Sequence, residues 1–312
     1  MKKYKTYIKI MRLDHWIKQL FILPGTVFAW VLLHPVPDRA LLLRFLFGFL
    51  STCLIASANY VINEWLDAEF DRYHPVKKHR SIVENGASPK IVYTLYGVLT
   101  VLGLAAALGS SRYVFYMELW LWVMGVLYNV KPIRTKDVVF LDVLSESVNN
   151  AIRLLIGWFI VTSSFYPPIS LIIGYWMGGA FLMATKRFAE YRMIDDPKTA
   201  ALYRRSFKYY TAKSLLLSAF FYAICSVFFT GIFLIKYRIE LLLMMPFLIG
   251  LFCYYFLIAF KDDSAVQKPE KLFKEKWLMG YVTFLCVLFA ILMVVDIPGL
   301  SSLLEIELIS TK

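Results

Sequence analysis

Apolar runs of about 20 residues recur along the whole chain, and each is long enough to cross the hydrocarbon core of a bilayer. Hydrophobic residues make up 59% of the 312 residues and the mean hydropathy is +0.61, more than a soluble domain carries. We therefore expect an all-α polytopic membrane protein, built as a bundle of about nine transmembrane helices. The expected spans are residues 17–34, 41–62, 91–110, 113–130, 139–162, 165–185, 212–235, 239–260 and 277–296.

Basic residues are strongly biased to one side of these spans. Of the 34 Lys and Arg residues, 27 fall in the N-terminal segment and in the connections after the second, fourth, sixth and eighth spans. The positive-inside rule then predicts a cytoplasmic N-terminus and an external C-terminus in the cell (inner) membrane. Since topology accounts for the formal charge of +12, we expect membrane lipids and no nucleic acid as partners.

No region of the chain separates as a soluble domain, so residues 1–312 are expected to form one transmembrane domain. Residues 1–16 are basic with scattered aromatics and are interpreted as an interfacial segment. A cleaved signal peptide is the alternative, which the lack of a small-residue cleavage site disfavours. The four cysteines fall in different apolar runs without a CxxC pair, which indicates neither a disulfide framework nor a metal site.

The most informative polar stretch is residues 63–80, NEWLDAEFDRYHPVKKHR, directly after the second apolar run. Asn63, Asp67 and Asp71 are four residues apart, so a continuing helix stacks them on one face, with Glu64 beside them. Carboxylates this close repel one another, and oxygen ligands suit Mg²⁺, which takes its remaining ligands from water and phosphates. We expect all four to bind Mg²⁺, or Mn²⁺ as an alternative, with Asp67 and Asp71 as the catalytic pair.

Basic residues follow this acidic stripe, as a site for a Mg²⁺–diphosphate substrate requires: Arg72, Lys77, Lys78 and Arg80. Pro75 is expected to end the helix. A solvated cytoplasmic loop between two spans is the alternative interpretation. We favour a binding site, because the acidic residues begin on the helix of the span itself and keep its helical spacing.

The fifth span contains ionisable residues at membrane depth. Arg153 shares a helical face with Asp142, Glu146 and Asn149. One interpretation is an internal ion pair of Arg153 with Glu146 or Asp142. The other is a cavity wall that holds or orients a polar substrate.

Two further connections carry basic residues on the predicted cytoplasmic side. Between the fourth and fifth spans the basic loop includes Tyr128, Asn129, Lys131, Arg134 and Lys136. At the end of the sixth span, Lys186, Arg187 and Glu190 are helix neighbours level with the Asn63 stripe. Residues 63–90 and 186–211 are therefore the expected cytoplasmic loops of the site. Arg204, Arg205 and residues 261–276 are expected only to enforce topology.

Residues 63–80 resemble the NDxxDxxxD motif of the UbiA superfamily of intramembrane prenyltransferases, and the span pattern extends the resemblance over nearly the whole chain. The continuation D-R-x-H-P-x-K-x-x-R is similar to the decaprenyl-phosphate phosphoribosyltransferase branch, as are Trp16-Ile17-Lys18 and the KRFAE at 186–190. Glu64 departs from the family's second-position Asp, and Ser81 from a frequent Pro. Extra residues also separate Tyr128 from Asp142, so that part of the branch pattern matches loosely.

The resemblance implies an active-site cavity that faces the cytoplasm and a Mg²⁺-dependent transfer of 5-phosphoribosyl. Phosphoribosyl pyrophosphate would be the donor, a polyprenyl phosphate lipid the acceptor, and pyrophosphate the leaving group. The substrate-binding residues expected on this basis are Lys18, Arg72, His74, Lys77, Arg80, Tyr128, Lys131, Arg134, Asp142, Glu146, Arg153, Lys186, Arg187 and Glu190.

Two other functions remain open. A UbiA-type prenyltransferase, moving a prenyl chain from its diphosphate to an aromatic or lipid acceptor, keeps the fold and the first motif. It should have a second aspartate-rich motif, whereas Asp195 and Asp196 are about 100° apart on a helix and replace it poorly. A transporter should show inverted repeats with broken helices, and no such repeat is evident.

Overall fold

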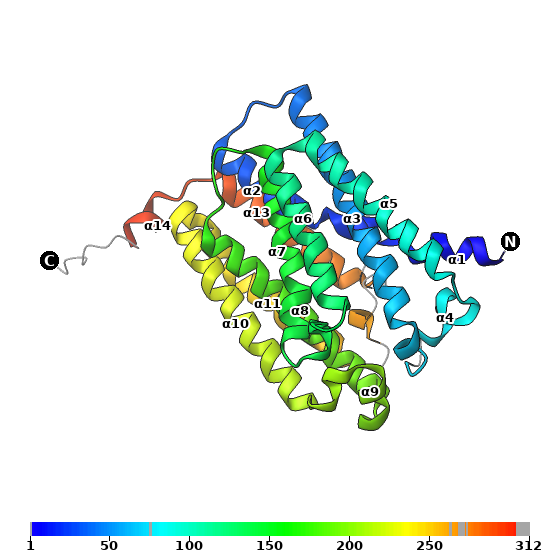
Figure 1. Cartoon of the computed structure of the whole chain (residues 1–312). Coiled ribbons are helices and arrows are strands. Elements are labelled where there is room, and N and C mark those ends of the chain that lie inside the picture. Colours follow the sequence, from blue (N-terminus) through cyan, green and yellow to red (C-terminus); the bar gives the residue numbers. More distant parts are fainter. Residues whose placement is uncertain (1, 75–76, 262–263, 268–271, 273, 304–312) are drawn as a thin grey trace.

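The computed structural model describes residues 2–74, 77–261, 264–267, 272 and 274–303 (Figure 1). Within them there is no strand. The elements in chain order are α1 (Lys2–Ile10), η1 (Leu13–Ile22), α2 (Leu23–Leu33), α3 (Arg39–Asp71), η2 (Lys77–His79), α4 (Ser81–Asn85), α5 (Pro89–Ser110), α6 (Arg112–Asn129), η3 (Thr135–Asp137), α7 (Leu141–Val161), α8 (Ile169–Ile194), α9 (Pro197–Tyr203), η4 (Arg205–Lys208), α10 (Ala212–Tyr237), η5 (Ile239–Met244), α11 (Met245–Ala259), η6 (Ala265–Gln267), α13 (Lys276–Val294) and α14 (Pro298–Leu303).

The helices confirm an all-α, multi-pass membrane protein. Among the residues that the structure describes, seven helical segments are long and apolar enough to cross a membrane: Tyr4–Leu33, Arg39–Asp71, Pro89–Ser110, Ile169–Ile194, Ala212–Tyr237, Ile239–Ala259 and Lys276–Val294. The other two expected spans coincide with α6 and α7, which are not among the seven. Polar residues such as Glu146 and Arg153 lower the hydropathy of α7. The count of nine therefore stays a prediction.

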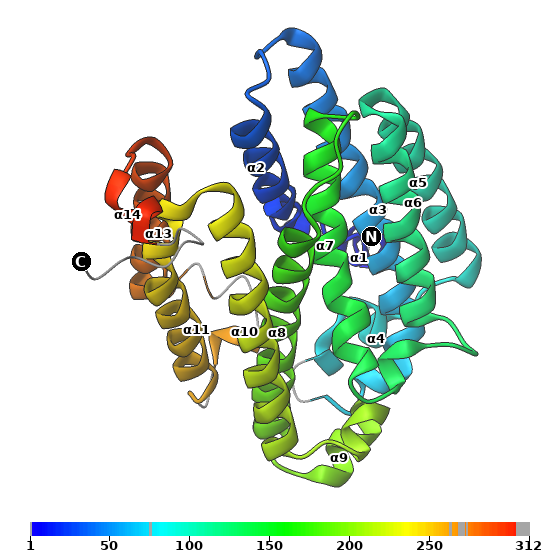
Figure 2. The same cartoon turned by 90° about the vertical axis from the view of Figure 1, so that its left-hand side faces the viewer.

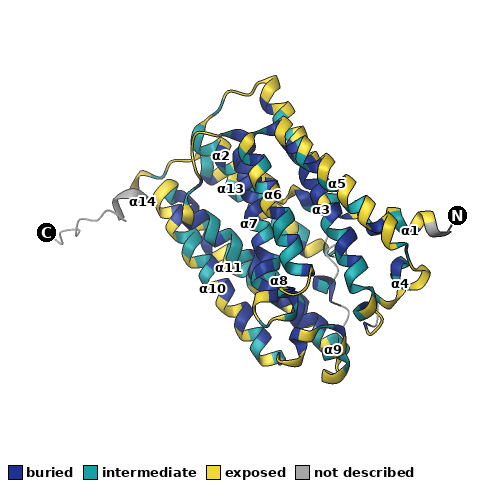
Figure 3. Ribbon diagram, viewed as in Figure 1, coloured by how far each residue is buried: buried dark blue, intermediate teal, exposed yellow. Residues whose placement is uncertain are grey.

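The bundle has two sides, with α3, α5, α6 and α7 on one and α8, α10, α11 and α13 on the other (Figure 2). Exposed residues follow the outer faces of α5 and α10 (Figure 3). They include large apolar side chains such as Leu102 and Phe221, which are 53% and 60% exposed. Apolar outer faces of this kind suit contact with lipid tails.

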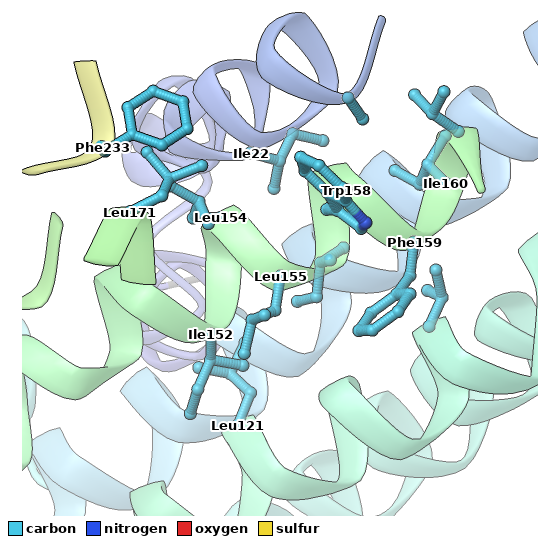
Figure 4. Packing of buried hydrophobic residues seen from close by; sticks show 14 of the residues in the cluster. Ile22, Leu121, Ile152, Leu154, Leu155, Trp158, Phe159, Ile160, Leu171 and Phe233 are labelled. Atoms are coloured by element: carbon cyan, nitrogen blue, oxygen red, sulfur yellow. The ribbon is translucent and has the colours of Figure 1, made fainter. Parts of the chain in front are cut away.

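The helix α7 lies at the centre of the bundle, where it packs against α2, α3, α6 and α8. From Leu154 to Val161 all of its residues are buried, and Leu154, Trp158 and Phe159 lie in the apolar cluster of Figure 4. Two glycines let α2 and α7 touch. A Cβ on Gly25 would lie 1.9 Å from the Leu154 carbonyl oxygen, and a Cβ on Gly157 would lie 1.9 Å from the Ile22 carbonyl oxygen. Gly25, in the first turn of α2, thus marks the place where the two helices cross.

The N-terminal segment is helical from Lys2, so helical structure begins well before the expected first span at 17–34. A left-handed backbone at Arg12, with φ of 51°, separates α1 from η1. In Figure 2 α1 is seen nearly end-on, whereas α3, α5 and α6 are seen lengthwise, in the plane of the picture. The axis of α1 is therefore steeply inclined to the axes of these bundle helices. This arrangement is compatible with the interfacial segment predicted for residues 1–16.

The helix α3 extends past the expected second span and carries the polar motif on its last turns. It has 33 residues, or about 50 Å of helix against a hydrocarbon core of about 30 Å. Its C-terminal end therefore projects beyond the apolar region, at the same end of the bundle as α4 and α9 (Figure 2). The helix stops at Asp71. Pro75, expected to end it, lies outside the described residues, as do Lys268, Lys271 and Lys312 of the basic-residue distribution.

Candidate active site

The acidic stripe of α3 forms as expected from its helical spacing. The Asn63 Nδ2 donates to Asp67 Oδ2 at 3.1 Å, which places the two side chains on one face, one turn apart. The Oδ1 atom of Asp67 accepts from Arg134 Nη2 at 2.9 Å and from Lys136 Nζ at 2.5 Å. The carboxylate of Asp67 is therefore held by two cations from the connection between α6 and α7.

A second oxygen joins this group through Asn129 at the end of α6. Its Oδ1 accepts from Asn63 Nδ2 at 2.5 Å and from Lys136 Nζ at 2.8 Å. Burial lowers the pKa of Lys136 to about 8, although Asp67 favours its charged form. Two amides and two cations thus surround the carboxylate of Asp67: Asn63, Asn129, Arg134 and Lys136.

The other acids of the motif have separate partners. Arg80 Nη1 donates to Asp71 Oδ2 at 2.7 Å, and its Nε lies 3.9 Å from Glu64 Oε1. The Nη1 of Arg12 donates to the same Glu64 oxygen at 3.1 Å. Burial opposes the charge of Arg80, but Asp71 and Glu64 outweigh it and raise the Arg80 pKa. Glu64, expected beside the metal, is buried against Arg12 from the N-terminal segment.

The KRFAE segment of α8 forms a second charged cluster around Arg187, which is 1% exposed. Its Nε lies 3.4 Å from Asp142 Oδ2 and its Nη1 lies 3.3 Å from Glu190 Oε2. Its Nη2 pairs with Glu146 and donates to Tyr128 Oη at 3.2 Å. Every nitrogen of the guanidinium therefore has a partner on the protein, so Arg187 holds α6, α7 and α8 together.

Lys77 connects the two clusters. Its Nζ donates to Glu190 Oε1 at 3.2 Å and to the hydroxyl of Tyr203, and it lies 4.6 Å from the centre of that ring. The ring of His74 meets the same Tyr203 ring edge-on, with centroids 4.5 Å apart. Burial lowers the pKa of His74 to about 3, and Lys77 adds to this effect. The 63–90 and 186–211 segments, predicted as the two loops of the site, are thus in contact.

Arg204 belongs to the site although its position predicted only a topological role. Its side chain is 13% exposed, with Nη1 3.8 Å from Asp142 Oδ2 and 3.4 Å from Tyr128 Oη. Those acids and hydroxyls outweigh burial and raise the Arg204 pKa well above its ordinary value. No local pattern distinguishes Arg204 from Arg205, whose side chain is 57% exposed. Arg12, Asn129 and Tyr203 were likewise missed as site residues.

Several expected residues lie elsewhere. Arg72 and Lys131 are exposed and make no ion pair with the clusters within the described chain. Lys18 donates to His15 Nε2 at 2.9 Å, on the N-terminal side of the site. The interpretation of Arg153 as an internal ion pair with Glu146 or Asp142 is wrong, because Arg187 pairs with both carboxylates and Arg153 forms no ion pair within the described residues. Arg153 instead donates to Gln19 Oε1 at 2.8 Å and to Asn150 Oδ1 at 3.3 Å.

In the described part of the chain, no three Asp, Glu, His or Cys side chains converge as a cluster that could hold a metal by themselves. The Nδ2 of Asn63 contacts Asp67 Oδ2 and Asn129 Oδ1, so a carboxylate oxygen and an amide oxygen lie close together on either side of it. Mg²⁺ in phosphate-binding enzymes commonly needs only one or two protein carboxylates, with substrate phosphates and water as its other ligands. The residues around Asp67 therefore fit a metal that arrives with a phosphate group.

The chain is similar to proteins of known name. It is 28% identical over 206 residues to the nodulation protein NoeC of Azorhizobium caulinodans, covering 66% of this chain and 64% of that protein. It is 27% identical over 214 residues to the decaprenyl-phosphate phosphoribosyltransferase of Mycolicibacterium smegmatis, covering 67% of this chain and 63% of that enzyme. The chain thus spans slightly under two thirds of the length of these relatives.

A solved structure has the same fold. A UbiA homolog from Archaeoglobus fulgidus bound to GPP and Mg²⁺ superimposes with a TM-score of 0.69 at 21% identity, over 93% of this chain and 100% of that one. The sequence model described as the UbiA prenyltransferase family matches residues 21–285, which run from the end of η1 into α13 and contain both the Asp67 and the Arg187 clusters. The chain therefore belongs to the UbiA prenyltransferase family.

Proposed function

We propose that this protein transfers 5-phosphoribosyl from phosphoribosyl pyrophosphate to the phosphate of a polyprenyl phosphate lipid, with Mg²⁺ and release of pyrophosphate. The observation that carries the proposal is the basic character of the second motif and of its surroundings. Lys186 and Arg187 stand where a second aspartate-rich motif is expected, and Arg204 shares the Tyr128 hydroxyl with Arg187. Two more cations, Arg134 and Lys136, bind Asp67 of the first motif. Two polyanionic substrates need this many cations in one place. Relatives named as decaprenyl-phosphate phosphoribosyltransferases support the same assignment.

The reaction breaks the bond between the anomeric carbon of ribose and the pyrophosphate oxygen. The pyrophosphate leaves with the bonding electrons, and an oxygen of the lipid phosphate forms the new bond to that carbon. The acceptor phosphate is already anionic, so it needs no strong general base. The residues of this chain bind and orient the two substrates, and their cations stabilise the charge that develops on the leaving group.

The Mg²⁺ would be held by Asp67 and by the amide oxygen of Asn129, with Asn63 as the neighbouring amide and Asp71 one turn along α3 as the second carboxylate; Mn²⁺ suits the same oxygen ligands. When bound, the metal neutralises charge on the pyrophosphate group. Lys136 and Arg134, which pair with Asp67, would contact the donor phosphates. The protein would lie in the inner membrane with its N-terminus in the cytoplasm, and the active site would face the cytoplasm.

The test is donor choice by the purified protein in lipid nanodiscs. We expect label from phosphoribosyl pyrophosphate to enter a lipid only when polyprenyl phosphate and Mg²⁺ are both present, and EDTA to stop the reaction. A parallel reaction supplies a prenyl diphosphate with an aromatic acid acceptor. If the protein makes labelled lipid only from the prenyl diphosphate, the proposal is wrong and the protein is a conventional prenyltransferase.

A further inference from the structure

Arg153 of α7 is a cation at membrane depth whose hydrogen-bond partners among the described residues are neutral. The carboxyl group of Glu118 lies within electrostatic range of it but forms no ion pair with it. Within the described residues Arg153 forms no ion pair, and its hydrogen bonds go to the amide oxygens of Gln19 and Asn150. The residue as a whole is only partly buried. A charge inside a span is costly unless it faces a partner or a polar space. A guanidinium that forms no ion pair is therefore suited to an anionic ligand.

The Arg153 side chain points along α7 toward the Arg187 cluster, and its charge lies deeper in the bundle than that cluster. Asn150 lies one turn toward the N-terminal end of α7, and the bond to it shows that the Arg153 side chain points that way. Glu146, which pairs with Arg187, lies one further turn along the same helix. The guanidinium of Arg153 is thus about one turn, or about 5 Å, deeper along α7 than this cluster.

Lys186 of α8 is a second cation without a carboxylate partner. Unlike Arg187 beside it, it forms no ion pair or hydrogen bond with a residue that the structure describes, and it is only partly buried. It lies within electrostatic range of Glu190 and Glu146, without forming an ion pair with either, and of His15 on η1. Both cations therefore lie near η1. Lys186 is close to His15, and Arg153 bonds to Gln19, about one turn after His15 on η1.

Independently, a ring nitrogen of His15 lacks a hydrogen-bond acceptor within the described residues. Its Nε2 receives hydrogen bonds from the cationic groups of Arg12 and Lys18, so Nε2 must carry the lone pair. The neutral ring then has its proton on Nδ1. That Nδ1 is buried without a hydrogen-bond partner in the part of the chain that is described, and the residue is only 8% exposed. A buried N–H donor without an acceptor is costly, which points to a ligand that supplies one.

We propose that Arg153 and Lys186, together with the Nδ1–H of His15, bind the phosphate of the lipid acceptor. This inference rests on the proposed function. A soluble donor reaches the Asp67 cluster from the cytoplasm, whereas a polyprenyl phosphate arrives within the bilayer, so its phosphate must lie on the membrane side of the donor. Arg153 is the cation at that depth. A phosphate monoester offers the charge and the hydrogen-bond acceptors that these three groups lack.

The experiment separates acceptor binding from donor binding. Binding of tritiated polyprenyl phosphate to the purified protein in nanodiscs is measured without donor, with the neutral polyprenol as competitor. Arg153→Gln and Lys186→Gln should each weaken this binding by about tenfold to hundredfold, and Arg153→Lys should restore part of it. In turnover, both variants should raise the KM for the acceptor and leave the KM for phosphoribosyl pyrophosphate within about twofold. Lys90→Gln, which removes an exposed cation from the start of α5, is the matched control.

Unchanged binding of polyprenyl phosphate in both Gln variants would overturn the inference, as would a rise in the donor KM alone. Lys186→Gln keeps the test decisive if Arg153→Gln fails to fold, because Lys186 holds no structural ion pair. The proposed function fails in a different way. A wild-type protein that uses only a prenyl diphosphate donor would reject phosphoribosyl transfer, and the binding measurement would still report whether Arg153 and Lys186 hold a lipid phosphate.

Discussion

Each guanidinium nitrogen of Arg187 pairs with a carboxylate of the protein, so its role differs from that of its neighbour Lys186. It pairs with Asp142, Glu146 and Glu190, which come from two helices. A direct contact with a substrate phosphate would require at least one of these bonds to break. We therefore assign Arg187 to positioning the cluster, and we assign direct phosphate contact to its less buried neighbours.

Arg187→Ala should mainly destabilise the protein. It leaves three acids in a largely buried cluster without their shared cation, and removing one partner of a buried ion pair typically costs about 3–5 kcal/mol. Thermal unfolding of the detergent-solubilised protein, followed by size-exclusion chromatography, should show a clearly lower midpoint. Lys186→Ala, on the same helix turn, should unfold near the wild-type temperature. Equal midpoints for the two variants would contradict the structural role of Arg187.

Asp67→Asn should lower kcat by about 10²–10³-fold or more while the protein stays folded. The amide keeps the shape of the side chain and its bond from Asn63, but it loses the charge that a metal and the two cations require. Steady-state turnover with saturating substrates measures the effect. Glu69→Gln is the control, because it removes one exposed carboxylate from the same helix. A near-normal rate in Asp67→Asn would remove Asp67 from the proposed metal site.

At the scale of elements, the site depends on contact between the connection after α3 and the α9 segment. The contact consists of His74 and Lys77 on one side and Tyr203 on the other. Burial opposes the charge of Lys77, but Glu190 outweighs it and raises the Lys77 pKa, so this pair stays charged at and above neutral pH. His74 behaves in the opposite way, because its buried ring is held neutral.

Acidification should therefore loosen this contact. The pKa of His74 falls from 6.5 to about 3 on folding, so its contribution to stability is complete above pH 6.5 and is lost as pH falls toward 3. At pH 5 the loss amounts to about 2 kcal/mol. Limited proteolysis of residues 72–88 should accelerate between pH 7 and pH 5 in the wild type. In His74→Asn, which has no ring to titrate, the same acidification should change the rate much less; an equal acceleration in both would contradict the assignment.

At the scale of the whole molecule, the charged clusters fix which connections share a side of the membrane. Asp67 at the end of α3 bonds to Arg134 and Lys136 between α6 and α7, and Glu190 at the end of α8 bonds to Lys77. These three connections therefore lie at one end of the bundle. Such an arrangement requires α6 and α7 to run the length of the bundle, which favours nine spans over seven.

A topology experiment tests this arrangement. A reporter that works only in the cytoplasm should be active when fused after Gly86, Lys131 or Asp196, and silent at Lys312. Labelling of an introduced cysteine at Lys131 from each side of sealed vesicles provides a second measurement, since Lys131 is exposed. Activity at Lys312 would show that the number of spans is even and that the nine-span prediction is wrong.

The sequence by itself determined the helical class, the places of the helices and the acidic stripe of α3. These follow from local rules: apolar runs of sufficient length form spans, and residues four apart share a helix face, as the bond from Asn63 to Asp67 confirms. The family resemblance in residues 63–80 and 186–190 extended this to the membership that the family match confirms.

Only the tertiary structure decided which charges meet. Local spacing predicted that Arg153 could pair with Glu146 or Asp142, yet Arg187 from α8 takes both acids and leaves Arg153 to Gln19, 134 residues away. Arg204 entered the site although it resembles its exposed neighbour Arg205 in every local respect. An ion pair depends on distance in space and on the burial of both partners, and neither quantity is encoded by the spacing of charges within one segment.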